Sequence, residues 1–149
     1  MRAVVQRVSA AEVEVAGDRI AEMDHGLLVL VGVGREDGPK DALELAHKLV
    51  GLRIFEDADG KMNRSLVDVG GTLGLVSQFT LWGDVRKGRR PSFGDAAEPE
   101  MARRLFDALV TEAKGLDVPV VTGRFGASMN VSLVNAGPVT ILLDTKRSF

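Results

Sequence analysis

The alternation of apolar and polar residues divides the chain into short strands and two helices. Residues 3–8 and 12–15 alternate in hydrophobicity, which is typical of half-buried strands. The run 27–33 is apolar throughout and has the length of a strand, so we expect it to be buried on both faces. Further strands are predicted at 52–55, 72–81, 118–122 and 129–145.

Two segments have the 3.6-residue period of amphipathic helices, and a proline suits the first turn of each, near Pro39 and Pro99. Their apolar stripes are Ala42, Leu45, Ala46, Leu49 and Val50 in the first helix, and Ala102, Leu105, Phe106, Leu109 and Ala113 in the second. The helices lie far apart among more numerous strands, so the order is not a repeating βαβ. We therefore predict one α+β domain over residues 1–149, with two main helices on a curved, mostly antiparallel sheet or partial β-barrel.

Composition limits the class of protein and its cellular location. A chain of 149 residues that is 45% hydrophobic can build one core, and its longest apolar run is too short to span a bilayer. The N-terminal segment alternates and carries charges, unlike a signal peptide, and the chain has no cysteine. We expect a cytoplasmic protein with no membrane partner. The net charge of −2 argues against non-specific coating of nucleic acid but allows a local basic patch.

Common catalytic and metal-binding motifs are missing. With no cysteine and only His25 and His47, both expected on the surface, the chain offers neither a cysteine nucleophile nor a zinc constellation. The segment 57–60 begins like a calcium loop, but its glycine comes too early, so a hairpin turn is predicted instead. These residues therefore indicate neither a zinc site nor a calcium site.

A basic run lies inside a long polar loop, residues 83–97. Loops of this length are often functional, and four cations within five residues can hold phosphate groups. The same composition also suits an ordinary solvated loop. Composition alone leaves both interpretations open for Arg86, Lys87, Arg89 and Arg90.

The segment 76–81 reads Val-Ser-Gln-Phe-Thr-Leu and is predicted to be extended. On a strand, Gln78 and Thr80 would share one face, about 6.5–7 Å apart. An amide and a hydroxyl so placed can bind the carbonyl and hydroxyl groups of one small polar ligand. The alternative is the solvent-facing side of an antiparallel strand.

The last predicted strand is interrupted by Asn135-Ala136-Gly137-Pro138. Proline cannot donate a ladder hydrogen bond, and an X-Pro bond is the only kind that adopts cis at low cost. Because glycine permits close backbone approach, Gly137 and Pro138 together can present bare carbonyl groups. A β-bulge or a bend explains the same residues without any ligand.

Taken together, these segments closely resemble the D-aminoacyl-tRNA deacylases. The resemblance is carried by Ser77-Gln78-Phe79-Thr80 and by Asn135-Ala136-Gly137-Pro138-Val139-Thr140. It extends in the same order over nearly the whole chain, through residues 5–8, 26–30, 53–55, 60–63, 90–93 and 122–125.

The resemblance implies hydrolysis of the ester that joins a D-amino acid to the 3′-terminal adenosine of tRNA, without metal or cofactor. It also implies a homodimer with two active sites at its interface. Each site would take Ser77, Gln78 and Thr80 from one subunit, and Gly137 and Pro138, joined by a cis peptide bond, from the other. Arg7 would hold the Gly-Pro turn, and the remaining residues implied at the substrate are Phe79, Phe125, Met129, Val139 and Thr140.

In this arrangement the backbone carbonyls at Gly137 and Pro138 occupy the place of an L side chain, so glycyl-tRNA should be hydrolysed like a D-substrate. We expect Gln78 and nearby N–H groups to stabilise the oxyanion, with Ser77 as support. Thr80 has no histidine beside it, so we prefer a positioning role and a water nucleophile assisted by the 2′-hydroxyl of the RNA. The alternatives are a non-catalytic tRNA- or RNA-binding module and a purely structural oligomer.

Overall fold

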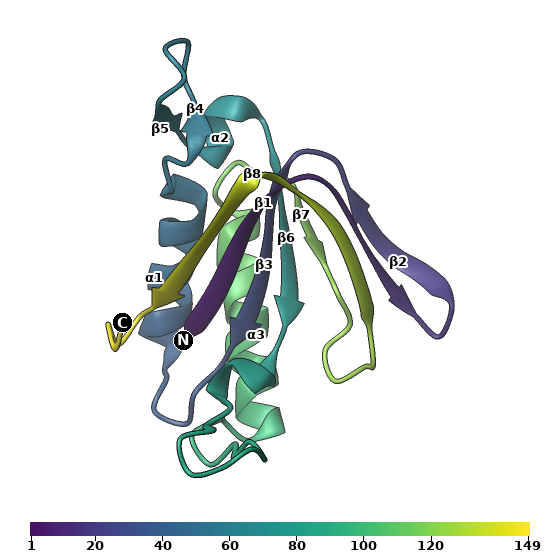
Figure 1. Cartoon of the computed structure of the whole chain (residues 1–149), viewed down its shortest axis with the longest axis vertical. Helices are drawn as coiled ribbons and strands as arrows, with labels where there is room; N and C mark the ends of the chain where they lie inside the picture. Colours follow the sequence, from purple (N-terminus) through teal and green to yellow (C-terminus); the bar gives the residue numbers. More distant parts are fainter.

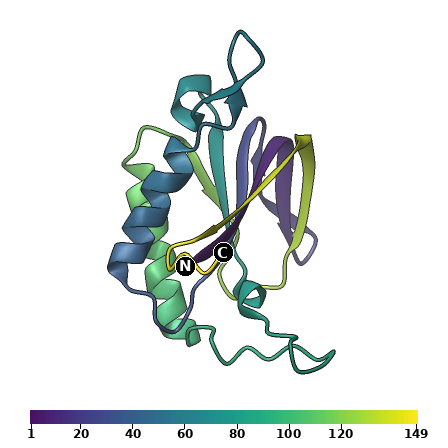
Figure 2. The ribbon, with the colours of Figure 1, turned by 60° about the vertical axis from the view of Figure 1, so that its left-hand side comes forward.

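A strongly curved sheet with two helices on one of its faces forms the protein in a computed structural model that describes residues 1–149 (Figures 1 and 2). The helices cover the same face of the sheet, and the long last strand crosses beside the first (Figure 1). In chain order the elements are β1 (Arg2–Val15), β2 (Asp18–Met23), β3 (Gly26–Gly32), α1 (Pro39–Gly51), β4 (Phe55–Glu56), β5 (Met62–Arg64), α2 (Leu66–Val69), β6 (Thr72–Ser77), the 3-10 helix η1 (Phe79–Trp82), α3 (Pro99–Lys114), β7 (Val120–Thr122) and β8 (Asn130–Asp144).

The main sheet has the order β2-β1-β3-β6-β7, and β8 pairs with β1 as well. The three pairings of β1, with β2, β3 and β8, are antiparallel. The pairs β3–β6 and β6–β7 are parallel, and the chain crosses between their strands through α1 and α3. The predicted α+β partial barrel is confirmed, whereas its two parallel crossovers were not predicted.

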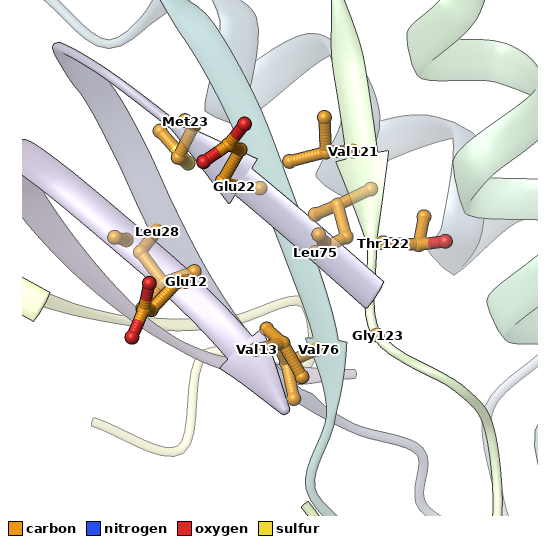
Figure 3. Close-up of a pocket in the computed structure, with 13 residues that line it drawn as sticks. Glu12, Val13, Glu22, Met23, Leu28, Leu75, Val76, Val121, Thr122 and Gly123 are labelled. Atoms are coloured by element: carbon orange, nitrogen blue, oxygen red, sulfur yellow. The ribbon is translucent and has the colours of Figure 1, made fainter. Parts of the chain in front are cut away.

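The two end strands of this order, β2 and β7, approach each other and nearly close the barrel. Side chains of Val13, Met23, Leu28, Leu75 and Val76 are among those that surround the remaining space between them (Figure 3). That space is a cavity of about 10 Å³, room for about one water molecule. The interior of the barrel is therefore closely packed at this point.

Both predicted helix stripes are buried in the main core. Leu45 and Leu49 of α1 and Leu105 and Leu109 of α3 are at most 2% exposed. They pack against β3, which is buried along nearly its whole length, as predicted for 27–33. Burial of each such side chain contributes about 1.5–3 kcal/mol. None of the helices is long and apolar enough to cross a membrane.

Long-range pairing joins segments that the sequence pattern separates. The predicted strands 3–8 and 12–15 form one strand, β1, because the residues between them pair with β8, where Ala10 lies opposite Val134. Residues 57–60 form the predicted hairpin turn, between β4 and β5. The short helix α2 was not predicted, although Ser65 and Asp68 form a reciprocal cap at its start.

Asp41, in the first turn of α1, gives a testable pH dependence. Burial raises the pKa of its carboxyl, but hydrogen bonds from Thr145, from the Gly38 N–H and from Lys146 outweigh burial and lower the pKa from 3.8 to about 2. Because the folded-state pKa is lowered, the carboxylate stabilises the fold above pH 4, and this stabilisation is lost as the pH falls through about 2. Asp41→Asn should therefore lower the free energy of unfolding by about 2 kcal/mol at pH 7.

Urea unfolding of both proteins between pH 7 and pH 2 measures this difference, which should shrink below pH 4. Glu44→Gln, an exposed neighbour on α1, is the control and should stay within about 0.5 kcal/mol of the wild type. A difference between Asp41→Asn and wild type that is constant over this pH range would contradict the assigned role of the carboxylate.

Candidate active site

The segment Ser77-Gln78-Phe79 borders a pocket of about 570 Å³ where β3 and β6 end. Thirteen of its eighteen lining residues are hydrophobic, and they include Phe125 and Met129 from the segment before β8. A largely apolar pocket with a few polar groups is the usual form of a site for a small ligand. The structure thus brings together five of the predicted site residues: Ser77, Gln78, Phe79, Phe125 and Met129.

The predicted strand over 72–81 is wrong beyond Ser77. The Gln78 N–H donates to the carbonyl of Val31 at 2.7 Å, and the chain then turns into η1. Within this turn the Gln78 side-chain amide, through Nε2, donates to Oγ1 of Thr80. The two side chains do lie together, but the turn brings them together and not the alternation of a strand. Thr80 itself is exposed and does not line the pocket.

Tertiary packing of Trp82 explains why the strand stops. Its ring lies against Gly34, where a Cβ would come within 2.4 Å of Cζ2 of the indole. The Arg2 guanidinium lies over the Trp82 ring, 3.9 Å from its centroid. Nη1 of Arg2 also donates a hydrogen bond to the Leu81 carbonyl at 3.2 Å. These contacts fix the end of η1 and hence the turn that carries Gln78.

Two aromatic pairs border the pocket. Phe79 is 58% exposed, and its ring meets that of Phe93 edge to face at 5.0 Å. Phe125 packs on Phe106 of α3, with ring centroids 6.1 Å apart. Exposed aromatic surface of this kind suits stacking with a nucleic-acid base or contact with an apolar side chain.

The Gly137–Pro138 peptide bond is cis, and it lies within β8, which continues on both sides of it. The interruption is an irregularity in the pairing of β8 with β1, and not a break between two strands. Arg7 contacts this turn from β1: its Nε donates to the Ala136 carbonyl at 2.9 Å, and its Nη1 donates to the Ile54 carbonyl at 2.7 Å.

Asn135 also shapes this turn, although it is not among the site residues predicted from the sequence. Its Oδ1 accepts from the Val139 N–H at 2.7 Å. Its Nδ2 donates to the Val139 carbonyl, to Oγ1 of Thr140 and to Oε1 of Gln6, at 3.1–3.2 Å. Asparagine is common in turns because its side chain bonds to nearby backbone, and that signal was available in Asn-Ala-Gly-Pro. Gly137 and Pro138 remain exposed, whereas Val139 is buried.

Within one chain the turn and the pocket lie far apart. Val8 of β1 pairs on one side with Asn135 of β8 and on the other with Gly26, at the start of β3. Ser77 pairs with Val31, near the end of β3. These positions are five residues apart along β3, a distance of roughly 17 Å. Figure 1 shows β8 bending at the upper end of the sheet, while β6 ends lower down. Accordingly, none of Arg7, Gly137, Pro138, Val139 or Thr140 lines the pocket of its own chain.

The basic run is exposed and partly paired. Nε and Nη2 of Arg86 donate hydrogen bonds to the carboxylate of Asp84 at 2.9 and 2.7 Å, and the backbone N–H of Arg86 donates a third. These hydrogen bonds keep the pKa of Asp84 below its usual range. Lys87, Arg89 and Arg90 are exposed and make no ion pair.

Both histidines are exposed, as predicted. His47 meets Glu112 at 2.7 Å, and His25 lies 3.1 Å from the Val69 carbonyl. Neither lines the pocket. No three side chains of the histidine and carboxylate types are grouped so that they could hold a metal ion.

Comparison with known proteins identifies the class. The sequence model of a family described as "D-Tyr-tRNA(Tyr) deacylase" matches residues 4–144, so the chain is an ester hydrolase of this family. It is 54% identical over 149 residues to a D-aminoacyl-tRNA deacylase of Thermosipho africanus and 58% identical to one of Anaeromyxobacter dehalogenans, with full coverage of both chains in each case. The chain belongs to the D-aminoacyl-tRNA deacylase family.

Solved structures share the fold. A structure of a protein called c-Myc DNA Unwinding Element Binding Protein superposes with a TM-score of 0.92 at 38% identity and covers 97% of this chain and 99% of that one. A probable eukaryotic D-amino acid tRNA deacylase gives a TM-score of 0.79 at 18% identity, covering 95% of this chain and 97% of that one, which shows likeness of fold alone.

Proposed function

We propose that this protein hydrolyses the ester between a D-amino acid, or glycine, and the 3′-terminal adenosine of tRNA. Beyond family membership, one observation carries the proposal: the Gln78 amide and the turn of η1 stand at the edge of an apolar pocket. That pocket can receive the terminal adenosine, while the polar groups meet the ester. Aminoacyl-tRNA is used in translation, so we place the activity in the cytoplasm.

The reaction needs only a positioned water and donors for the oxyanion, because an aminoacyl ester is already activated. Water attacks the acyl carbon, the ester carbonyl becomes an oxyanion, and the bond to the ribose 3′-oxygen then breaks. The leaving oxygen takes up a proton, and free amino acid and tRNA result. We assign oxyanion stabilisation to Gln78 and neighbouring N–H groups, and assistance of the water to the 2′-hydroxyl of the RNA.

Thr80 should be a positioning residue and not a nucleophile. Its Oγ1 accepts a hydrogen bond from Gln78, no histidine is near to activate it, and it does not line the pocket. Thr80→Val should therefore lower kcat only about tenfold, through a less ordered Gln78. Single-turnover hydrolysis of D-alanyl-tRNA measures the loss. Trapping of an acyl-enzyme on Thr80, or a loss as large as about 10⁵-fold, would show that Thr80 is the nucleophile.

We further propose a homodimer in which the Gly137–Pro138 turn of one subunit completes the pocket of the other. The roughly 17 Å along β3 between turn and pocket supports this, because the turn does not line the pocket of its own chain and is free to meet another. β8 pairs only with β1 and so has a free edge, and its Val134 and Leu142 are 58% and 59% exposed. An open strand edge with exposed apolar side chains is suited to contact with a second copy.

The basic run offers phosphate contacts for the same substrate, through Lys87, Arg89 and Arg90, since Arg86 is already paired with Asp84. Turnover decides between a hydrolase and a module that only binds nucleic acid. The test incubates the protein with D-alanyl-tRNA and measures free alanine over time. Release of alanine supports the proposal, and saturable binding without release would favour the non-catalytic module.

A further inference from the structure

Two exposed arginines have no role in the reaction described above: Arg103, which lies at the edge of the pocket, and Arg124, which directly precedes Phe125 in the sequence. We call Arg103 and Arg124 the arginine rim. The guanidinium carbon of Arg103 lies 4.8 Å from the ring centroid of Phe125. A Cβ at Gly126 would lie 3.9 Å from Nη2 of the same arginine. Phe125 and Gly126 both line the pocket, so this guanidinium stands at its edge.

Helix α3 holds Arg103 in this place. Arg103 and Phe106 are three residues apart and therefore lie on the same face of the helix. Both contact the Phe125 ring, Phe106 by aromatic packing and Arg103 by a cation–π contact. A guanidinium fixed on a ring loses less freedom on binding a ligand than a side chain that extends into solvent.

Neither arginine of the rim is held in an ion pair. Arg103 and Arg124 are exposed, and Glu100 and Asp107 lie about one turn from Arg103 on α3. The pocket itself shows the opposite character, because its only charged lining residue is Glu98. An apolar pocket with one carboxylate repels phosphate, so the phosphates of a bound nucleotide chain must stay outside, where the rim lies.

We propose that Arg103, together with Arg124, binds phosphate groups of the single-stranded 3′ end of tRNA next to the terminal adenosine. The inference rests on the proposed function and specifies how that substrate is held. Arginine suits the task because its planar fork donates two hydrogen bonds to one phosphate. Both arginines are separate in sequence from the basic run of residues 86–90, so the RNA meets cations from three segments of the chain.

The test compares D-alanyl-tRNA with 3′-O-D-alanyl-adenosine, which has the same ester and no phosphate. We compare kcat/KM on D-alanyl-tRNA with kcat/KM on the adenosine ester. Arg103→Gln should lower the ratio of the two values by about fivefold at 0.1 M salt, because one phosphate contact to a single strand contributes about 0.7 to the slope of log affinity against log salt. The loss should appear in KM, and the slope of log KM against log salt should fall by about 0.7. Arg103→Lys keeps the charge and should restore most of the slope.

Lys48→Gln is the matched control, because it removes one exposed, unpaired charge from α1 and should leave the ratio unchanged. Hydrolysis of both substrates with an unchanged ratio and slope in Arg103→Gln would overturn the role of the rim and leave the proposed function standing. Equal losses on both substrates would reduce Arg103 to a support for Phe125 and also overturn it. Failure of the wild type to hydrolyse either substrate would overturn the proposed function and this inference with it.

Discussion

D-Alanyl-tRNA and glycyl-tRNA should both be hydrolysed at least about 10³-fold faster than L-alanyl-tRNA. The expectation follows from a filter made of backbone at Gly137 and Pro138, which would occupy the place of an L side chain. Backbone that Arg7 and Asn135 hold by hydrogen bonds cannot move aside easily, so the clash is nearly absolute. Glycine has a hydrogen in both directions and should pass. Rates of amino acid release from the three esters, on one tRNA body, measure the effect.

Glycyl-tRNA separates this filter from a pocket that selects D-residues by gripping their side chains. Loss of side-chain packing costs only about 1–3 kcal/mol, so a gripping pocket would hydrolyse glycyl-tRNA some 10–200-fold more slowly than the D-alanyl ester. A filter that only rejects would leave the two rates similar. A glycyl ester as resistant as the L-alanyl ester, or equal rates on all three, would rule out the Gly137–Pro138 turn as the filter.

The sequence predicted those parts of the fold that depend on local period. The stripes of α1 and α3 are all buried, because a helix that covers a sheet must turn its apolar face inward whatever the sheet's topology. The burial of β3 could also be predicted from the local pattern, because a short uninterrupted apolar run has no polar face to turn to solvent. Period alone says nothing about which strands pair, and so the two parallel crossovers were missed.

Tertiary contacts decided the parts of the candidate site that were predicted wrongly. The alternation in 76–81 fits a strand, but Trp82 packs on Gly34 and beneath Arg2, and this packing favours the turn of η1. Those partners are 48 and 80 residues away in the sequence, so no local pattern reveals them. The exposed basic run was equally ambiguous, because only the folded structure shows that Arg86 is already paired with Asp84.

Two variants that each have low activity alone should regain activity when their subunits are mixed, if the active site is shared between subunits. Gln78→Ala removes the proposed oxyanion donor. In Gly137→Ala, the new Cβ at φ 139° would lie 2.8 Å from Cγ2 of Val139 and 3.0 Å from Nη2 of Arg7, which displaces the turn. Each variant alone should lose about 10²–10³-fold in kcat on D-alanyl-tRNA.

A mixed dimer of these variants has one site with both defects and one with neither, because each subunit supplies the segment that the other lacks. Random exchange makes half of the dimers mixed, so activity should return to about a quarter of the wild-type value. Gln78→Ala mixed with Phe79→Ala is the matched control, since both changes lie in the pocket segment and every site stays defective. If the turn and the pocket of the same chain formed each active site, every site in the mixed dimer would carry a defect. No recovery, with subunit exchange verified by a mass label, would therefore place the whole site within a single subunit.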